Sequence, residues 1–253
     1  MNLGFIGTGK IASSIIFGIF KSNLKINRIY ISSRNRNIAK KLKGRFSKIK
    51  ICSNNQEIID KASVIFLSVT PPVGKKILNN LSFKGKTVIS LISTINEREL
   101  KSKIHSKNIC KAIPLPFIEN RVGPIIICPK NRIAKKIFSK LGLVIEVNKE
   151  KLSFNFWATS SFMASYYEIY NSMTKWLIRR GLKKSQATNY VAELFFALSK
   201  DALLKKNIGF DKLVSDSQTP KGLNMQVLKE LKKVKFYEKM NKSLNNVYKK
   251  FKK

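Results

Sequence analysis

The sequence predicts an α/β fold in which a Rossmann-type parallel sheet is followed by an all-helical domain. Three observations support this prediction. A glycine-rich turn follows an apolar run at the start of the chain. Strand-like apolar runs then alternate with helical segments, which is typical of a parallel sheet. From Leu152 onward no strand-like run occurs. We therefore expect two domains, over residues 1–150 and residues 151–253.

The first fourteen residues, MNLGFIGTGKIASS, have the pattern of a strand, a glycine turn and the start of a helix. Gly7 permits the tight turn, Gly9 lets the backbone approach a pyrophosphate, and Ala12 is small enough for close packing of helix and strand. Free N–H groups at a helix start favour phosphate. The turn therefore predicts a dinucleotide site, and the residues expected to contact the cofactor here are Gly7, Thr8, Gly9, Lys10 and Ile11.

The end of the second predicted strand, Arg28–Ser32, indicates which dinucleotide is bound. Sites for NAD usually place an acidic residue here to hold the ribose 2′-hydroxyl. This chain instead continues with Ser33 and Arg34. Hydroxyl and guanidinium groups suit a 2′-phosphate, since arginine offers a planar fork of donors. We therefore expect NADP rather than NAD, the alternative being that Ser33 and Arg34 belong to an ordinary basic loop.

A continuous apolar run, residues 63–69, is typical of a parallel strand that is buried on both faces. Ligands of such sheets lie outside the carboxyl ends of the strands, so Val69, Thr70 and Pro71 should border the cofactor. Further strands are expected over residues 87–92, 108–113, 123–128 and 143–147.

The second domain is predicted to be helical and rich in aromatic residues. Apolar residues recur at three- and four-residue steps from Phe154 to Trp176, which indicates one face of a helix. Ser185 is expected to cap a second helix, and a third is expected after Thr219 and Pro220. Because about 100 residues of this kind are often completed by a second copy, we predict a homodimer or higher homo-oligomer through these helices.

The excess of basic residues raises the question of whether the protein binds nucleic acid. The chain has 253 residues, 50 Lys and Arg against 14 Asp and Glu, and a formal charge of +36. Basic residues are spread along the whole chain, which indicates a compositional bias with lysine at solvated positions, so we do not expect nucleic-acid binding. The surface would still favour anionic ligands.

No apolar run approaches the roughly 20 residues that span a bilayer. The start lacks the basic region of a signal peptide, and three widely spaced cysteines fit no metal site, so we expect a cytoplasmic protein without a metal.

Several segments along the chain are similar to the motifs of one known family. The segment GFIGTGKIA, residues 4–12, is similar to that family's opening G-F-I-G-x-G-x-M-A. VIFLSVTPP, residues 64–72, is similar to its strand ending in V-K-P. VISLISTI, residues 88–95, occupies the place of V-I-S-x-x-A-G-I, and KAIPLP, residues 111–116, that of R-x-M-P-N-T-P. At the level of motifs, the whole chain therefore resembles the pyrroline-5-carboxylate reductase family. The resemblance implies a Rossmann domain, a helical dimerisation domain, and reduction of a cyclic imine, 1-pyrroline-5-carboxylate, to proline with a nicotinamide cofactor.

The chain departs from the family near the expected substrate. Leu115 replaces an asparagine, Phe162 a serine between glycines, and Leu223 and Asn224 the two threonines of S-P-G-G-T-T. Two alternatives therefore stay open: a related oxidoreductase acting on another imine or a carbonyl compound, and a non-catalytic dinucleotide-binding protein. Reduction of an imine needs a donor near its nitrogen. The residues expected to supply it are Thr219 and Asn224, although Thr219 could equally cap the helix with Pro220 at its first position.

Overall fold

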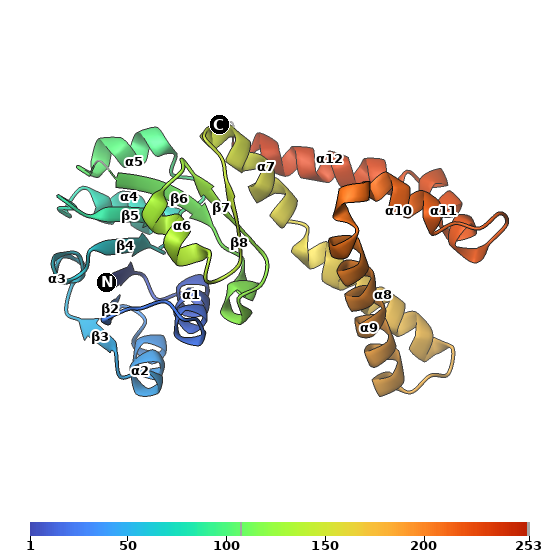
Figure 1. The fold of residues 1–253 in the computed structure, drawn as a ribbon, viewed down its shortest axis with the longest axis horizontal. Coiled ribbons are helices and arrows are strands. Elements are labelled where there is room, and N and C mark those ends of the chain that lie inside the picture. The colour runs from blue at the N-terminus through green and yellow to red at the C-terminus, as the bar shows by residue number, and fades with distance from the viewer. Residues whose placement is uncertain (107, 252–253) are drawn as a thin grey trace. The chain divides into compact units, whose positions relative to one another are not determined.

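The structure is a computed structural model that describes residues 1–106 and 108–251, so the last two residues of the second predicted domain lie outside it. The chain forms two compact units, Met1–Trp157 and Ala158–Lys253. The division falls within helix α7 (Glu150–Ser160), a few residues beyond the boundary expected after residue 150. The strands all belong to the first unit, and the described part of the second unit is helical (Figure 1).

The first unit is built on one eight-stranded sheet with the strand order β3-β2-β1-β4-β5-β6-β7-β8. The order reverses between β1 and β4, which places a topological switch point beside the glycine turn. The strands are β1 (Asn2–Ile6), β2 (Arg28–Ser32), β3 (Ile49–Cys52), β4 (Val64–Leu67), β5 (Thr87–Ser90), β6 (Asn108–Ile113), β7 (Pro124–Cys128) and β8 (Leu143–Glu146).

Helices cover both faces of this sheet (Figure 1). Buried side chains of α1, α2 and α6 join one apolar cluster, and those of α3, α4 and α5 join a second. The helices are α1 (Lys10–Lys21), α2 (Arg36–Arg45), α3 (Asn55–Lys61), α4 (Pro71–Leu78), α5 (Glu97–Lys103) and α6 (Arg132–Phe138), with the 3₁₀ helix η1 (Pro116–Asn120).

Alternation along the strands explains why two clusters form. In β4, Phe66 enters the α1 cluster, whereas Ile65 and Leu67 enter the α3 cluster. Phe66 stacks on Phe5 of β1, with ring centroids 4.5 Å apart, and meets the edge of Phe138 of α6 at 6.0 Å. Burial of both strand faces therefore explains why these runs are continuously apolar.

The last two strands depart from the expected parallel arrangement, because both run opposite to β1–β6. β7 pairs antiparallel with β6, while β8 is parallel to β7. The connection between β6 and β7 contains only η1, and a parallel crossover needs a longer link, usually with an α-helix. The sheet is thus mostly parallel, and its parallel part, β3 to β6, contains the switch point.

The second unit is entirely helical over its described residues, 158–251. Its helices are α8 (Met163–Arg179), α9 (Lys184–Leu204), the 3₁₀ helix η2 (Lys206–Ile208), α10 (Phe210–Asp216), α11 (Leu223–Lys233) and α12 (Phe236–Lys249). The single helical face predicted from Phe154 to Trp176 is wrong, because turns at Ser161 and Phe162 separate α7 from α8. Ser185 lies inside α9, whose N-cap is Lys183, so its predicted capping role is also wrong.

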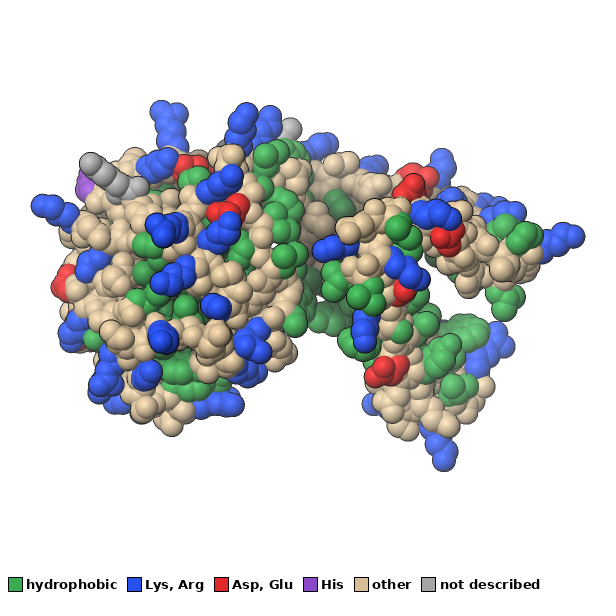
Figure 2. Space-filling view, in the orientation of Figure 1, with side chains coloured by type: hydrophobic (Ala, Val, Ile, Leu, Met, Phe, Trp, Pro, Cys, Tyr) green, Lys and Arg blue, Asp and Glu red, His purple; other side chains and the backbone are tan. Residues whose placement is uncertain are grey.

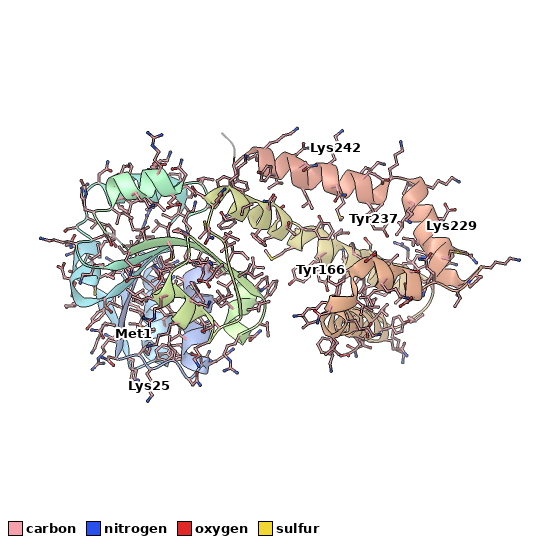
Figure 3. All side chains as sticks on the ribbon, turned by 45° about the horizontal axis from the view of Figure 1, so that its top comes forward. Met1, Lys25, Tyr166, Lys229, Tyr237 and Lys242 are labelled. Carbon is pink, nitrogen blue, oxygen red and sulfur yellow. The ribbon has the colours of Figure 1, made fainter. Side chains whose placement is uncertain are left out.

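Apolar side chains are widely exposed in this unit (Figure 2). Among its described residues, the buried ones are Ala158, Ala187 and Val191. A cavity of about 1070 Å³ lies between α8 and the pair α11–α12, and Tyr237 of α12 is among the residues that line it (Figure 3). Tyr170 of α8 stacks on Phe195 of α9 at 4.4 Å. Stacked rings thus join α8 to α9, but little of the unit is enclosed.

Candidate functional site

The glycine turn after β1 has a backbone that other residues cannot adopt without strain. Gly7 has a φ of +99°, and a Cβ atom at this position would lie 2.5 Å from the Ser68 carbonyl oxygen. This distance is much shorter than a van der Waals contact, and positive φ is a conformation that glycine adopts readily. The turn therefore depends on Gly7 for conformation and for its close approach to the end of β4.

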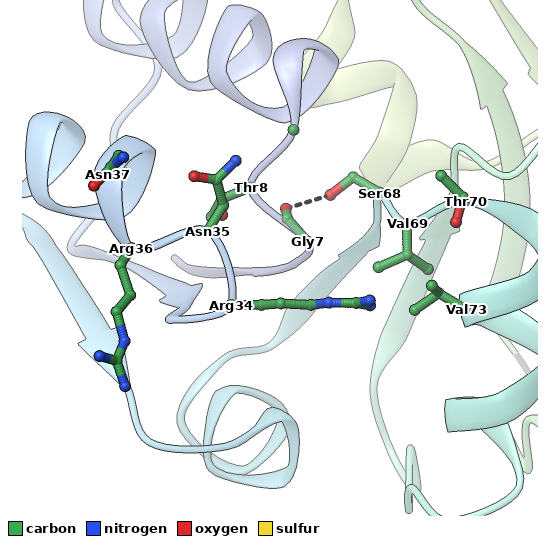
Figure 4. A pocket seen from close by; sticks show the side chains of 11 residues that line it. Gly7, Thr8, Arg34, Asn35, Arg36, Asn37, Ser68, Val69, Thr70 and Val73 are labelled. Carbon is green, nitrogen blue, oxygen red and sulfur yellow. Dashed lines mark hydrogen bonds between the residues drawn. The ribbon is translucent and has the colours of Figure 1, made fainter.

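Two serine hydroxyls hold this turn from opposite sides. The Gly7 N–H donates to Ser32 Oγ at 3.1 Å, and Ser68 Oγ donates to the Gly7 carbonyl oxygen at 2.7 Å. Ser32 ends β2 and Ser68 follows β4, so the two strands that flank β1 both fix the turn. The Ser68 hydroxyl bond is drawn in Figure 4. This arrangement preorganises the backbone that faces a ligand.

The start of α1 has the features of a pyrophosphate site. Gly9 is the N-cap, and a Cβ built there meets no described atom within 4 Å. The first turn carries no acidic residue, so its N–H groups and the helix dipole favour an anion. Thr8 is 2% exposed, and its Oγ1 has no hydrogen-bond partner among the described residues. An orphaned hydroxyl beside an open cradle fits a phosphate group.

These residues line a cavity of about 630 Å³ at the carboxyl ends of β1, β2 and β4 (Figure 4). Six residues expected from the sequence line it together: Gly7, Thr8, Gly9, Arg34, Val69 and Thr70. Lys10 and Ile11 form the first two positions of α1, Pro71 opens α4, and Ser33 precedes Arg34, but these four are not among the lining residues. Five further lining residues were not predicted from the sequence: Asn35, Arg36, Asn37, Ser68 and Val73. Ser68, a polar residue within an apolar run, and Asn35, a helix-capping residue, were available signals.

The β2 end of the cavity is basic. Arg34 extends across it toward Val69 and Val73, and Arg36 turns the other way (Figure 4). The Asn35 side chain caps α2 by accepting from the Ile38 N–H at 3.3 Å, and the first turn of α2 carries no acidic residue. A 2′-phosphate would therefore meet guanidinium and backbone donors here, and no acidic side chain in this turn would repel it.

Thr219 and Asn224 belong to the second unit and flank the start of α11. Gly222, not Thr219, is the N-cap of α11, and the helix begins at Leu223, so the alternative cap formed by Thr219 and Pro220 is wrong. The Asn224 amide donates to the Ser217 carbonyl oxygen at 2.9 Å, which uses one of its two N–H groups. The Thr219 carbonyl oxygen accepts from the Gly222 N–H at 2.8 Å. Both side chains are exposed.

The cysteines are buried in the first unit and are chemically quiet. Burial raises the pKa of Cys110 to about 12, and burial with nearby carboxylates raises the pKa of Cys52 and of Cys128 to about 11. Within the part of the chain that the structure describes, no group of three or more His, Cys, Asp and Glu could hold a metal ion. No helix of that part combines the length and the hydropathy needed to cross a membrane.

Comparisons with known families match both units. A family described as NADP oxidoreductase, coenzyme F420-dependent, matches residues 2–94. A family described as pyrroline-5-carboxylate reductase dimerisation matches residues 151–253. A pyrroline-5-carboxylate reductase of Haemophilus influenzae is 24% identical over 212 residues, which are 78% of this chain and 77% of that protein.

Solved structures share the fold over the whole chain. The crystal structure of Plasmodium falciparum pyrroline carboxylate reductase with NADP bound has a TM-score of 0.85 and 23% identity, covering 100% of this chain and 97% of that one. The 1-pyrroline-5-carboxylate reductase of Streptococcus pyogenes has a TM-score of 0.86 and 20% identity, covering 100% and 98%. At such identities these structures show the fold alone.

Proposed function

The chain belongs to the pyrroline-5-carboxylate reductase family, and from this premise we propose that it reduces 1-pyrroline-5-carboxylate to proline with NADPH. The observation that supports the proposal most is the cavity at the switch point, where an open glycine cradle, an orphaned Thr8 hydroxyl and the Arg34 guanidinium lie together. These groups match a dinucleotide that carries an extra phosphate.

The reaction makes modest demands on side chains. When bound, reduced nicotinamide supplies the hydride that the imine carbon accepts. The chain must hold the two reactants in line and place a hydrogen-bond donor beside the imine nitrogen, because proximity and orientation account for much of the rate. In the first unit, the turn fixed by Ser32 and Ser68 holds the phosphates, and Val69 and Thr70 border the same cavity.

For the substrate we propose the segment of the second unit from Thr219 to Asn224. Thr219 offers a hydroxyl, and Asn224 offers the amide N–H that is not used by Ser217. The bond to Ser217 sets the orientation of the Asn224 side chain. The second amide N–H of Asn224 then supplies a donor where the family pattern has a threonine hydroxyl. A Thr219→Val variant, which keeps the shape but removes the hydroxyl, should raise KM for the imine and leave NADPH binding unchanged.

A second candidate is reduction of a bulkier or less polar imine, and three departures from the family pattern favour it. Leu115, Phe162 and Leu223 stand where the family has an asparagine, a serine and a threonine. Phe162 lines the apolar cavity of the second unit. Apolar replacements remove hydrogen-bond donors that a small imino acid would use, so activity with a larger cyclic imine above that with 1-pyrroline-5-carboxylate would favour this candidate.

The second unit is a dimerisation domain of this family, and we propose a homodimer as its smallest assembly in a cytoplasmic enzyme. The widely exposed apolar side chains of α8 to α12 support this assignment. Sedimentation velocity distinguishes a dimer from a 28.9 kDa monomer and from larger assemblies.

The proposed function is tested by oxidation of the reduced cofactor, followed by absorbance, with 1-pyrroline-5-carboxylate as substrate. We expect turnover with NADPH well above turnover with NADH. A protein that binds NADPH tightly but turns over neither this imine nor a panel of other imines would contradict the proposal.

A further inference from the structure

A lysine is buried in the sheet two strands away from β4, which borders the cofactor cavity. Lys111 lies in β6, and its side chain is 4% exposed. Lysines are almost never fully buried unless they are paired, because removing a charge from water is costly. Such a position needs a local partner for each ammonium hydrogen.

The structure supplies three acceptors, one for each of the three hydrogens. Lys111 Nζ donates to the Ile95 carbonyl oxygen at 2.7 Å, to the Ser93 carbonyl oxygen at 3.2 Å, and to Glu150 Oε1 at 2.7 Å. The second carboxylate oxygen, Glu150 Oε2, accepts from the Glu97 N–H at 2.9 Å. The pair thus connects β6, the loop after β5, the first residue of α5 and the first residue of α7, all within the first unit.

The loop held in this way, residues 91–96, follows the strand next to the cavity. Along the carboxyl edge of the sheet, Arg34 follows β2, the glycine turn follows β1, Val69 and Thr70 follow β4, and this loop follows β5. A dinucleotide with its 2′-phosphate at Arg34 and its pyrophosphate at the turn has only the β4 and β5 side left for its nicotinamide half. The loop of residues 91–96 is therefore the next backbone along that direction.

We propose that Lys111 and Glu150 are positioning residues for hydride transfer. They hold the backbone of residues 93–95 in the place where it supports the nicotinamide half of the cofactor, and they make no contact with the phosphates. This inference rests on the proposed function. It predicts that loss of the ion pair changes the environment of the reacting ring and the rate of the chemical step, while the affinity for NADPH, set mainly at the turn and at Arg34, is kept.

The test compares full-length variants. Lys111→Met combined with Glu150→Gln removes both charges, which avoids leaving one buried and unpaired. Lys111→Arg keeps the positive charge. Lys135→Met is the matched control, because it breaks another lysine–glutamate pair of the same unit, Lys135 Nζ to Glu146 Oε2 at 2.6 Å, on the surface. Circular dichroism checks the fold of each variant.

Three quantities are measured: the dissociation constant for NADPH, the fluorescence of bound NADPH, and kcat with its isotope effect from 4-deuterated NADPH. In the double variant we expect NADPH affinity within about threefold of wild type, a changed nicotinamide fluorescence, a kcat at least about tenfold lower, and a larger isotope effect because hydride transfer becomes slower. Lys111→Arg should recover part of kcat and fluorescence, and Lys135→Met should match wild type.

The outcomes separate this inference from the proposed function. Wild-type kcat and wild-type nicotinamide fluorescence in the folded double variant would overturn the inference. Equal losses of affinity, kcat and folding would also overturn it, since they indicate general disorder. If wild type does not reduce 1-pyrroline-5-carboxylate, the proposed function fails, and the fluorescence of bound NADPH still decides the role of Lys111. If the double variant does not fold, Lys111→Arg serves the comparison, because it keeps the charge pair and changes the geometry of the three bonds that hold the loop.

Discussion

Two glycines only two residues apart should differ in how the same substitution changes the free energy of unfolding. Gly7→Ala places a Cβ at a φ of +99° and 2.5 Å from the Ser68 carbonyl oxygen. The strained backbone costs about 1–3 kcal/mol. Displacement of the turn also weakens the bonds with Ser32 and Ser68, each contributing about 1 kcal/mol. We expect a loss of about 3–5 kcal/mol in the free energy of unfolding of the first unit, with weaker NADPH binding as a consequence.

Gly9→Ala should affect the ligand and not the fold. Gly9 has φ −76° and ψ −174°, which alanine also adopts, and its Cβ has open space among the described residues. Lower entropy of the unfolded chain contributes about 0.4–1 kcal/mol, which offsets the weaker N-cap. The free energy of unfolding should therefore change by less than about 1 kcal/mol. The methyl group would occupy the approach of the pyrophosphate, so NADPH affinity should fall by about tenfold or more.

The assay is urea unfolding followed by circular dichroism, together with calorimetric titration of NADPH, on wild type and both variants. Two results would refute the reasoning: an unchanged unfolding midpoint for Gly7→Ala, or wild-type NADPH affinity for Gly9→Ala. Equal destabilisation by both substitutions would show that the packing of the whole turn, and not the position of one carbonyl group, limits its stability.

Three further predictions follow from the first unit. Arg34→Ala should lower the preference for NADPH over NADH by about 10- to 100-fold, since a charge-assisted bond contributes about 1.5–3 kcal/mol. The KM values for the two cofactors measure this preference, and an unchanged ratio of KM values would contradict the prediction. Phe66→Ala should cost about 3–5 kcal/mol, because the ring is fully buried, whereas Leu143→Ala, 62% exposed, should cost less than about 0.5 kcal/mol in the same urea assay. Iodoacetamide should label the native cysteines at least about 100-fold more slowly at pH 8 than it labels the unfolded chain. A raised pKa keeps the thiol protonated, so the rate should rise about tenfold per pH unit toward pH 10, and labelling at the unfolded rate would exclude this account of Cys52, Cys110 and Cys128.

The first unit could be predicted largely from the sequence because its signals are local. Continuous apolar runs such as residues 63–69 indicate strands buried on both faces, and the glycine turn indicates a helix start. Pro71–Leu78, by contrast, was not predicted as a helix. Two successive prolines suggest a turn, yet Pro71 occupies the first helical position, where a missing N–H has no cost. The direction of β7 was also missed, because it depends on the absence of a crossover helix between β6 and β7.

The site could be predicted where function follows from backbone conformation, from charge or, as for Val69 and Thr70, from a place at the carboxyl end of a strand. Gly7, Gly9 and Arg34 were found from the spacing of the turn and from the missing acid after β2. The buried Lys111 could not be found, since a lysine in a basic chain looks like any other solvated residue, and its partners come from distant segments, residues 93–95 and Glu150. The helix break at Ser161 and Phe162 was missed because apolar periodicity continues across it.

Because few side chains of the second unit are buried, the folding of this unit should depend on the concentration of the protein. Only two alanines and a valine are buried among its described residues, which is too little apolar burial to offset the conformational entropy of about ninety ordered residues. We therefore expect its native form to draw free energy from association, and mass action then makes the melting temperature rise with protein concentration. At low protein concentration, a newly synthesised chain would have a folded cofactor domain and a helical domain that has not yet associated with a second copy. Expression level, more than any single contact, would then set how much enzyme is present in the native form.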